Sequence, residues 1–420
     1  MWWLLFLVGC GSDSGDTAQA LVPPPIPRSV TDQIDPHNIK THTDVLADDA
    51  YGGRIPGSPG AIMAREYIQA QMIEIGLEPL GMDNSYVYTY PNQPGEGYFM
   101  LDDLGNVVDH ATTEGVNLVG AIPGTDPEHA DEVVVVMAHY DHLGVDSSGD
   151  SFNGAFDNAA AVAMNLELAR VFIENGVSFG RTVVFMFTDD EEFGLDGARE
   201  WIGEPTVPQE KVVFGVSTDP LGRKVVPDFG PIALMGLERS TGLSEIWAEA
   251  ATHINAPVYQ IHRDIIPIFS SDQDPFWEQE TPALWFTNIG FSFYHTVDDT
   301  ADTIDYVMML ENAHLLAYAL KLIGDDAQRY TFLGQQPVKG VHAQAAKEVF
   351  EDIKESNWLS QDDKDFADTH IEKLDLVIEA DSEDAVDNPE IAYTAALYFL
   401  LYDLPGKYPG EIPPPWPEGW

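Results

Sequence analysis

Short apolar runs alternate with amphipathic stretches through the first 330 residues of the chain. Four runs rich in valine and phenylalanine predict strands buried on both faces, at residues 133–138, 181–188, 212–218 and 282–289. Three stretches carry apolar residues at helical spacing, at residues 59–75, 157–176 and 303–323. Strands that alternate with helices predict an α/β fold, a three-layer sandwich around a mixed, mostly parallel central sheet.

The pattern changes after about residue 330, where amphipathic helices follow one another with no strand between them. These predicted helices cover residues 342–356, 365–380 and 389–404, and a tail rich in proline and tryptophan follows them. We therefore expect a main domain over residues 31–330 and a helical C-terminal extension over residues 331–420.

Residues 1–30 differ in composition from both of these regions. The apolar run "MWWLLFLVG" is much shorter than the roughly 20 residues that span a bilayer, and it resembles the core of an export signal. "LVGC" resembles a bacterial lipoprotein processing site that would lipidate Cys10, although no Lys or Arg precedes the run. We expect residues 1–30 to be signal and flexible tether, and the protein to be lipid-anchored in the cell envelope. An ordinary signal peptide or a buried N-terminus is the alternative.

The amino-acid composition argues against some classes of binding partner. The 70 acidic residues against 20 basic ones give a formal net charge of −50, which repels nucleic acid and anionic lipid. Such a surface keeps a protein soluble at high ionic strength, where its self-repulsion is screened. The single cysteine excludes an intramolecular disulfide.

Histidine and carboxylate residues follow the predicted strands at their carboxyl ends, where open α/β sheets bind ligands. The first strand leads to His139 and Asp141, and Asp157 heads the helix that comes next. The later strand ends lead to Asp189, Asp190, Glu191 and Glu192, to Asp219, and to Tyr294 and His295.

Imidazoles and carboxylates that converge on one sheet edge are typical of a divalent metal site, and the absence of thiolates suits a catalytic zinc. The carboxylates outnumber the needs of one ion, so two metals that share a bridging carboxylate fit better. Of the adjacent Glu191 and Glu192, one can bind metal while the other serves as a general base.

Several segments, in order along the chain, resemble the signature of the M28 metallopeptidases, a family of di-zinc aminopeptidases. They are "GGRIPGSPGAIMAREYIQAQMIEIGLEPLG", "AHYDHLG", "GAFDNAAAVA", "DDEEFGLDGA", "SSDQDPF" and "YHTVDDTADTID". The resemblance covers roughly residues 45–323. One departure is Gln273, at a position where the family more often has histidine.

The resemblance implies a role for each of eight residues. It implies two zinc ions with five ligands, His139, Asp157, Glu192, Asp219 and His295, of which Asp157 bridges. Glu191 matches the general base, Asp141 the carboxylate that orients His139, and Tyr294 a hydroxyl that helps to stabilise the oxyanion. Because Pro220 stands where members usually have an apolar residue, Asp228 is the reserve for Asp219.

Each of these residues also has an ordinary structural interpretation. His139 could be a core histidine, Asp157 could cap the following helix, and Glu191 and Glu192 could form a solvated turn. We expect His142 to be structural, and Asp189 and Asp190 to have no catalytic role. No support as ligands exists for His37, His42, His110, His129, His253, His262, His314, His342 or His370.

The resemblance implies an exopeptidase that removes N-terminal residues from peptides, with a metal-activated water and Glu191 as its base. A glutaminyl cyclase with one zinc is an alternative on the same fold. A carboxypeptidase is another, with Arg223 or Arg263 for the substrate carboxylate. The alternative that is not an enzyme is a metal-free receptor-like or scaffold protein.

Overall fold

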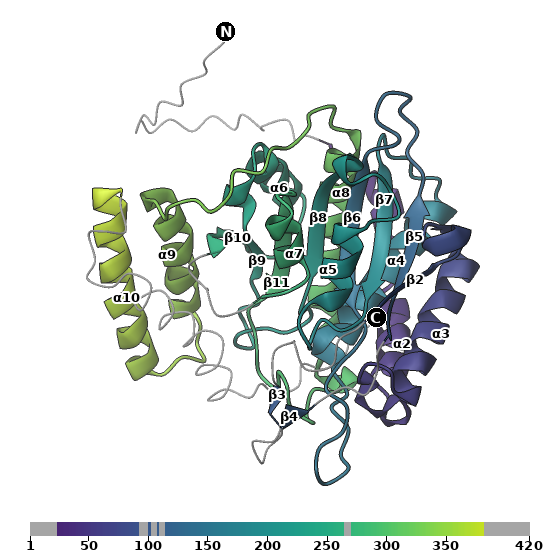
Figure 1. Ribbon diagram of the computed structural model, residues 1–420. Coiled ribbons are helices and arrows are strands. Elements are labelled where there is room, and N and C mark those ends of the chain that lie inside the picture. The colour runs from purple at the N-terminus through teal and green to yellow at the C-terminus, as the bar shows by residue number, and fades with distance from the viewer. Residues whose placement is uncertain (1–22, 92–99, 102–106, 109–113, 264–269, 382–420) are drawn as a thin grey trace.

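The computed structural model describes residues 23–91, 100–101, 107–108, 114–263 and 270–381. A twisted central sheet is covered by helices on both faces, which confirms the predicted three-layer α/β architecture (Figure 1). The strand order is β1-β5-β7-β6-β8-β11-β9-β10, and β2 pairs with β5 as a branch. In the part of the chain that the structure describes, we find no helix with the length and apolarity that a membrane span requires.

The strands of this sheet are β1 (Glu78–Pro79), β2 (Val87–Pro91), β5 (Glu114–Ile122), β6 (Val133–His139), β7 (Thr182–Thr188), β8 (Val212–Thr218), β9 (Ile232–Met235), β10 (Val258–Ile261) and β11 (Ala283–Asn288). A separate two-stranded ribbon joins β3 (Met100–Leu101) to β4 (Val107–Val108). β6, β7, β8 and β11 correspond to the four predicted strands.

The helices are α1 (Arg28–Thr31), α2 (Pro36–Leu46), α3 (Pro59–Ile75), α4 (Ala160–Glu174), α5 (Asp196–Gly203), α6 (Leu243–Ala251), α7 (Gln273–Glu278), α8 (Tyr306–Asp325), α9 (Gly340–Lys354) and α10 (Gln361–Ala380). Shorter helical turns include η1 (Asp49–Arg54) and η3 (Ala155–Ala159). α3 begins at a proline and ends at the left-handed Gly76, as the sequence predicts.

The valine run of β6 is buried on both of its faces. Alternate residues point in opposite directions along a strand, so Val134 and Val136 join the core under α2, α3, α4 and α8. Val133 and Val135 join the core on the other face, where Trp201 of α5 stacks on Phe276 of α7. A strand inserted between two helical layers therefore needs an apolar residue at every position.

β6 lies where the direction of chain winding reverses. The chain passes from β6 through α4 to β7 on one side, then through α5 to β8 on the other side, and both neighbours run parallel to β6. In open α/β sheets such a switch point opens a crevice at the carboxyl ends of the strands. His139 is the last residue of β6 and pairs with Thr188, the last residue of β7, so the polar segments after both strands meet there.

The lipidation predicted at Cys10 lies outside the described residues, as do residues 1–22 altogether. The described end of the predicted tether packs on the domain. Ile26 is buried in the main core, and the Arg28 guanidinium donates to the backbone carbonyl of His253. Packing thus begins before residue 31.

α9 and α10 form an antiparallel pair beyond β10, at the sheet edge far from α2 and α3 (Figure 1). The Tyr259 hydroxyl on β10 donates to Asp352 on α9, and the Ser356 hydroxyl donates to Asp228 at 2.6 Å. The extension therefore covers the edge strand β10, whose backbone would otherwise be open to pairing. The third predicted helix, at 389–404, lies outside the described residues.

Candidate metal centre

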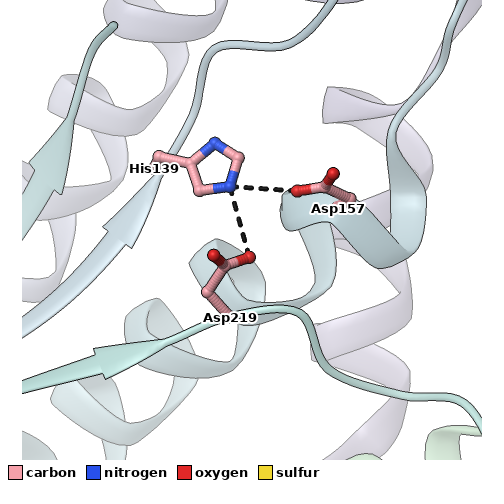
Figure 2. A group of neighbouring side chains, drawn as sticks. All are labelled: His139, Asp157 and Asp219. Carbon is pink, nitrogen blue, oxygen red and sulfur yellow. Dashed lines mark hydrogen bonds and ion pairs between the residues drawn. The ribbon is translucent and has the colours of Figure 1, made fainter. Parts of the chain in front are cut away.

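His139 lies at the centre of the crevice, completely buried at the end of β6. Its Nε2 atom is 3.0 Å from Asp157 Oδ1 and 3.3 Å from Asp219 Oδ1. Figure 2 shows the three side chains and marks both contacts. Asp219 directly follows β8, and Asp157 lies in η3 before α4. The three ligand atoms are close enough to hold one metal ion together.

A second group of donors lies on the other side of Asp157. His295 Nε2 is 3.0 Å from Asp157 Oδ2 and 3.2 Å from Glu192 Oε2. His142 Nδ1 is 2.5 Å from Glu192 Oε1, and it forms a second potential metal group with Asp157 and Glu192.

Asp157 is shared by the two groups. Its Oδ1 faces His139, and its Oδ2 faces His295, so one carboxylate presents an oxygen to each side. Burial opposes its ionisation, but hydrogen bonds with His139 and His295 hold the pKa of Asp157 well below its usual range. α4 is preceded by Ala159 with no side-chain cap, so Asp157 does not cap this helix.

Asp141 joins the ends of β6 and β7. Its carboxylate accepts hydrogen bonds from the backbone N–H groups of Glu191 and Glu192, at 3.2 and 3.3 Å. It also lies 3.5 Å from Nδ1 of His139, whose shorter contact, 3.2 Å, is with the Asp141 backbone carbonyl. Asp141 therefore positions the two glutamates as well as the imidazole, which the sequence did not indicate.

Glu191 and Glu192 face the crevice and are not part of a solvated turn. Burial raises the pKa of Glu191 well above its usual range, and the negative charges of Asp219 and Glu192 raise it further. Glu192 differs, because His295 and His142 counteract burial and lower its pKa to about 2. Two adjacent carboxyl groups thus differ in basicity, as a proton acceptor and a ligand would.

Tyr294 stacks on the ring of His295, with centroids 3.8 Å apart. Burial raises the pKa of its hydroxyl well above 10, as do the nearby charges of Asp157, Glu192, Glu191 and Asp219. The hydroxyl therefore keeps its proton and remains a hydrogen-bond donor beside the carboxylates.

Arg54, in η1, holds the loops that carry the donors. Its buried guanidinium donates to four backbone carbonyls, those of Leu46, Tyr140, Asn153 and Gly154, at 2.6 to 3.0 Å. These bonds fix the segment after β6 and the segment before Asp157 in one arrangement. In the sequence Arg54 was only one residue of a glycine- and proline-rich loop.

Two further side chains support the aspartates. The buried Asp299 accepts hydrogen bonds from the backbone N–H groups of Phe156 and Asp157, at 2.9 and 3.2 Å. Ser271, from the "SSDQDPF" segment, donates to Asp219 at 2.6 Å.

The structure brings all eight sequence-predicted residues to this crevice. Asp228, the reserve candidate, instead accepts from Ser356 near α9. Gln273 is buried and donates to Asp274 at 2.9 Å. Asp190 accepts a hydrogen bond from Tyr90, and Asp189 accepts one from the backbone of Val116. Sequence reasoning missed Arg54 and Asp299, and it expected His142 to be structural, whereas His142 lies in a potential metal group.

Two adjacent groups of buried imidazole and carboxylate donors at one end of a mixed α/β sheet form a candidate centre for divalent metal ions. Residues 117–320 match the family model described as Peptidase family M28. This part of the chain is thus similar to the M28 metallopeptidases, in agreement with the resemblance of the sequence motifs.

Similar curated proteins match the chain over part of its length. A putative endoplasmic reticulum metallopeptidase 1 of Schizosaccharomyces pombe is 30% identical over 172 residues, which are 40% of this chain and 20% of that protein. A probable glutamate carboxypeptidase of Arthroderma benhamiae is 32% identical over 119 residues, 28% of this chain and 15% of that protein. The chain thus matches a fifth or less of the length of these relatives.

Solved structures share the fold. A zinc aminopeptidase from Bacillus subtilis has a TM-score of 0.54 at 15% identity, covering 70% of this chain and 96% of that one. The glutaminyl cyclase of Porphyromonas gingivalis has a TM-score of 0.51 at 19% identity, covering 69% of this chain and 98% of that one. At these identities the likeness extends to the fold alone.

Proposed function

We propose that the protein is a zinc-dependent aminopeptidase that hydrolyses the N-terminal peptide bond of peptides. The observation that carries this proposal is the position of Asp157, which presents one oxygen to His139 and the other to His295. A carboxylate shared in this way suits a pair of metal ions.

The donors fit zinc. They are imidazole nitrogens and carboxylate oxygens, the ligand types of catalytic zinc sites. His139, Asp157 and Asp219 would hold one ion, and Asp157, Glu192 and His295 would hold the other. Zinc supplies a nucleophilic water at neutral pH and polarises the scissile carbonyl.

Glu191 would act as the base. Its carboxylate lies 4.0 Å from His139 Nε2, beside the donors of the first group, and burial raises its pKa well above the usual range. Glu191 accepts a proton from the attacking water and returns it to the leaving amine. The Tyr294 hydroxyl, which keeps its proton, donates a hydrogen bond to the oxygen that becomes negative during the attack.

A carboxypeptidase is the second candidate, and one observation favours it. Arg223 is buried and its Nε donates to Ser292, three residues before His295, at 3.2 Å. Its Nη1 atom has no hydrogen-bond partner among the described residues. A buried guanidinium with a free donor could bind the carboxylate at a substrate C-terminus.

The decisive experiment compares the purified full chain with Glu191→Gln on aminoacyl-anilides and on N-blocked peptides with a free C-terminus. We expect about two zinc ions per chain in both proteins, release of the N-terminal residue, and a loss of kcat in the variant of roughly 10²-fold or more. Release of C-terminal residues only would replace the aminopeptidase by the carboxypeptidase. One zinc with pyroglutamate formation would indicate a cyclase, and no bound metal would indicate a scaffold protein.

Arg223→Met is the matched variant for the second candidate. We expect it to leave aminoacyl-anilide hydrolysis within a few-fold, and a selective rise in KM for C-terminal substrates would instead support the carboxypeptidase. Cell-envelope location, lipid attachment at Cys10 and the domain limits 31–330 and 331–420 stay predictions.

A further inference from the structure

We propose that His142, through Nδ1, is a fourth side-chain ligand of the metal held by Asp157, Glu192 and His295. The two metal positions would then differ in their number of protein donors. This inference rests on the proposed function, because it assumes that the crevice binds two metal ions.

The position of the ring carries the proposal. His142 is completely buried, and its Nδ1 atom lies 2.5 Å from Glu192 Oε1 and 3.9 Å from Asp157 Oδ2. Its other nitrogen, Nε2, is buried without a hydrogen-bond partner in the described part of the chain. The imidazole therefore acts on its surroundings through Nδ1, which faces the donors.

The spacing of His142 and His295 suits two imidazoles on one ion. Their ring centroids are 5.7 Å apart, with an angle of 69° between the ring planes. Imidazoles that bind one zinc through nitrogens at 2.0–2.1 Å have centroids about 5–6 Å apart. Both rings also face the same two carboxylates, Asp157 and Glu192.

The backbone around His142 holds the ring in this place. The His142 N–H donates to the backbone carbonyl of Arg54 at 3.3 Å. Gly154 has a φ of 54° and lies against the ring, since a Cβ atom there would be 2.5 Å from His142 Cδ2. The ring thus occupies space that is open only because residue 154 is glycine.

The consequence is an unequal pair of metal positions. His139, Asp157 and Asp219 offer three side chains, whereas Asp157, Glu192, His295 and His142 offer four. The position with four side chains fills at a lower free metal concentration and keeps its ion longer during chelation. The competing interpretation is that His142 only donates a hydrogen bond to Glu192 and orients it.

His142→Asn separates these interpretations. The asparagine amide nitrogen lies near the place of Nδ1, so it can still donate to Glu192, but it is a poor zinc ligand. His142→Ala removes both functions, and His129→Asn is the control at a histidine on the surface, paired with Asp126. Folding of each variant is checked by circular dichroism, and zinc affinity is measured by competition with a chelator.

We expect wild type to bind two zinc ions in two steps, and the tighter step to weaken by about 100-fold or more in both His142→Asn and His142→Ala, with His129→Asn unchanged. Loss of an orienting contact alone costs about 10- to 100-fold, and His142→Asn keeps that contact, so a large loss in this variant points to a direct bond. An unchanged tighter step in His142→Asn, with a loss in His142→Ala alone, would assign His142 to orientation and overturn the proposal.

X-ray absorption on wild type needs no variant. With one equivalent of zinc we expect two imidazoles per ion; one imidazole would refute the direct bond. If wild type binds no zinc, the proposed function fails and His142 has no metal to bind. If it binds two ions and the tighter step does not depend on residue 142, the inference about His142 fails alone.

Discussion

Asp299 shows how a residue without a predicted role supports the centre. It accepts backbone hydrogen bonds from Phe156 and Asp157, and burial raises its pKa to about 6, although the bond from Phe156 opposes that shift. Because its carboxylate accepts hydrogen bonds from two consecutive backbone N–H groups, Asp299 fixes the turn that orients the Asp157 side chain.

We expect Asp299→Asn to weaken zinc binding by about 10-fold while the protein stays folded, because one acceptor remains and the geometry is nearly kept. Asp299→Ala should weaken it more, by up to about 100-fold. Calorimetric zinc titration measures both. Equal affinity in all three proteins would show that the turn holds its shape without Asp299.

His42 gives a prediction about pH away from the metal centre. Its Nδ1 lies 2.6 Å from the Tyr67 hydroxyl, and burial, helped by the charge of Arg170, lowers its pKa to about 4. The unfolded chain takes up this proton near pH 6.5 and the folded protein only near pH 4. His42 therefore costs stability as the pH falls through that window, by up to about 3 kcal/mol.

Urea unfolding of wild type and His42→Asn at pH 7.5, 5.5 and 4.5 checks this. The free energy of unfolding of wild type should fall relative to that of the variant as the pH decreases. The metal centre is common to both proteins and cancels in the difference. A difference that does not change with pH would contradict the prediction.

At the scale of elements, Arg54 joins the end of α2, the end of β6 and the loop before η3. Replacing it by methionine would leave the buried carbonyls of Leu46, Tyr140 and Asn153 without a donor, whereas the Gly154 carbonyl keeps the Ala159 N–H, and each unsatisfied group costs about 1–3 kcal/mol. We expect Arg54→Met to destabilise the protein by at least about 3 kcal/mol in urea unfolding.

Arg199→Met is the control for this prediction. Arg199 is exposed and pairs with Glu278 at the surface, so its loss should cost less than about 1 kcal/mol. Similar losses in the two variants would mean that water replaces the Arg54 donors.

The elements that were predicted correctly are those with a clear signal in their own residues or in the residues directly beside them. The valine run of β6 and the Pro59 and Gly76 boundaries of α3 are local signals, and they were correct. β9 and β10, with four residues each, are too short for a distinct pattern, so they were missed. The helix predicted from residue 157 begins at Ala160, because η3 turns the Asp157 side chain into the crevice.

The same limit applies to the site. Donors at the end of a recognisable strand or directly after it, such as His139 and Asp219, could be found from their position. Arg54 and Asp299 act on backbone groups far away along the chain, which no local pattern encodes. His142 differs from a core histidine only through its contact with Glu192, in the turn that follows β7.

At the scale of the whole molecule, the main electrostatic feature is the formal net charge of −50. Repulsion among so many carboxylates weakens the folded state at low ionic strength, and salt reduces it as the Debye length falls from about 30 Å at 0.01 M to about 3 Å at 1 M.

We therefore expect the melting temperature of the protein to rise with sodium chloride, most steeply below about 0.2 M. Sucrose at matched osmolality is the control, because it does not screen charge. A melting temperature independent of salt would show that the acidic groups lie too far apart to destabilise the fold.

The donors of the centre are far apart along the chain, from His139 to His295, and they meet only at the edge of the finished sheet. A chain under synthesis exposes His139, Asp157 and Asp219 long before His295 exists. Under the proposed function, the complete set of donors forms only when the sheet is assembled, so we expect the domain to fold before both zinc ions are bound. Zinc loading would then be a maturation step that follows folding.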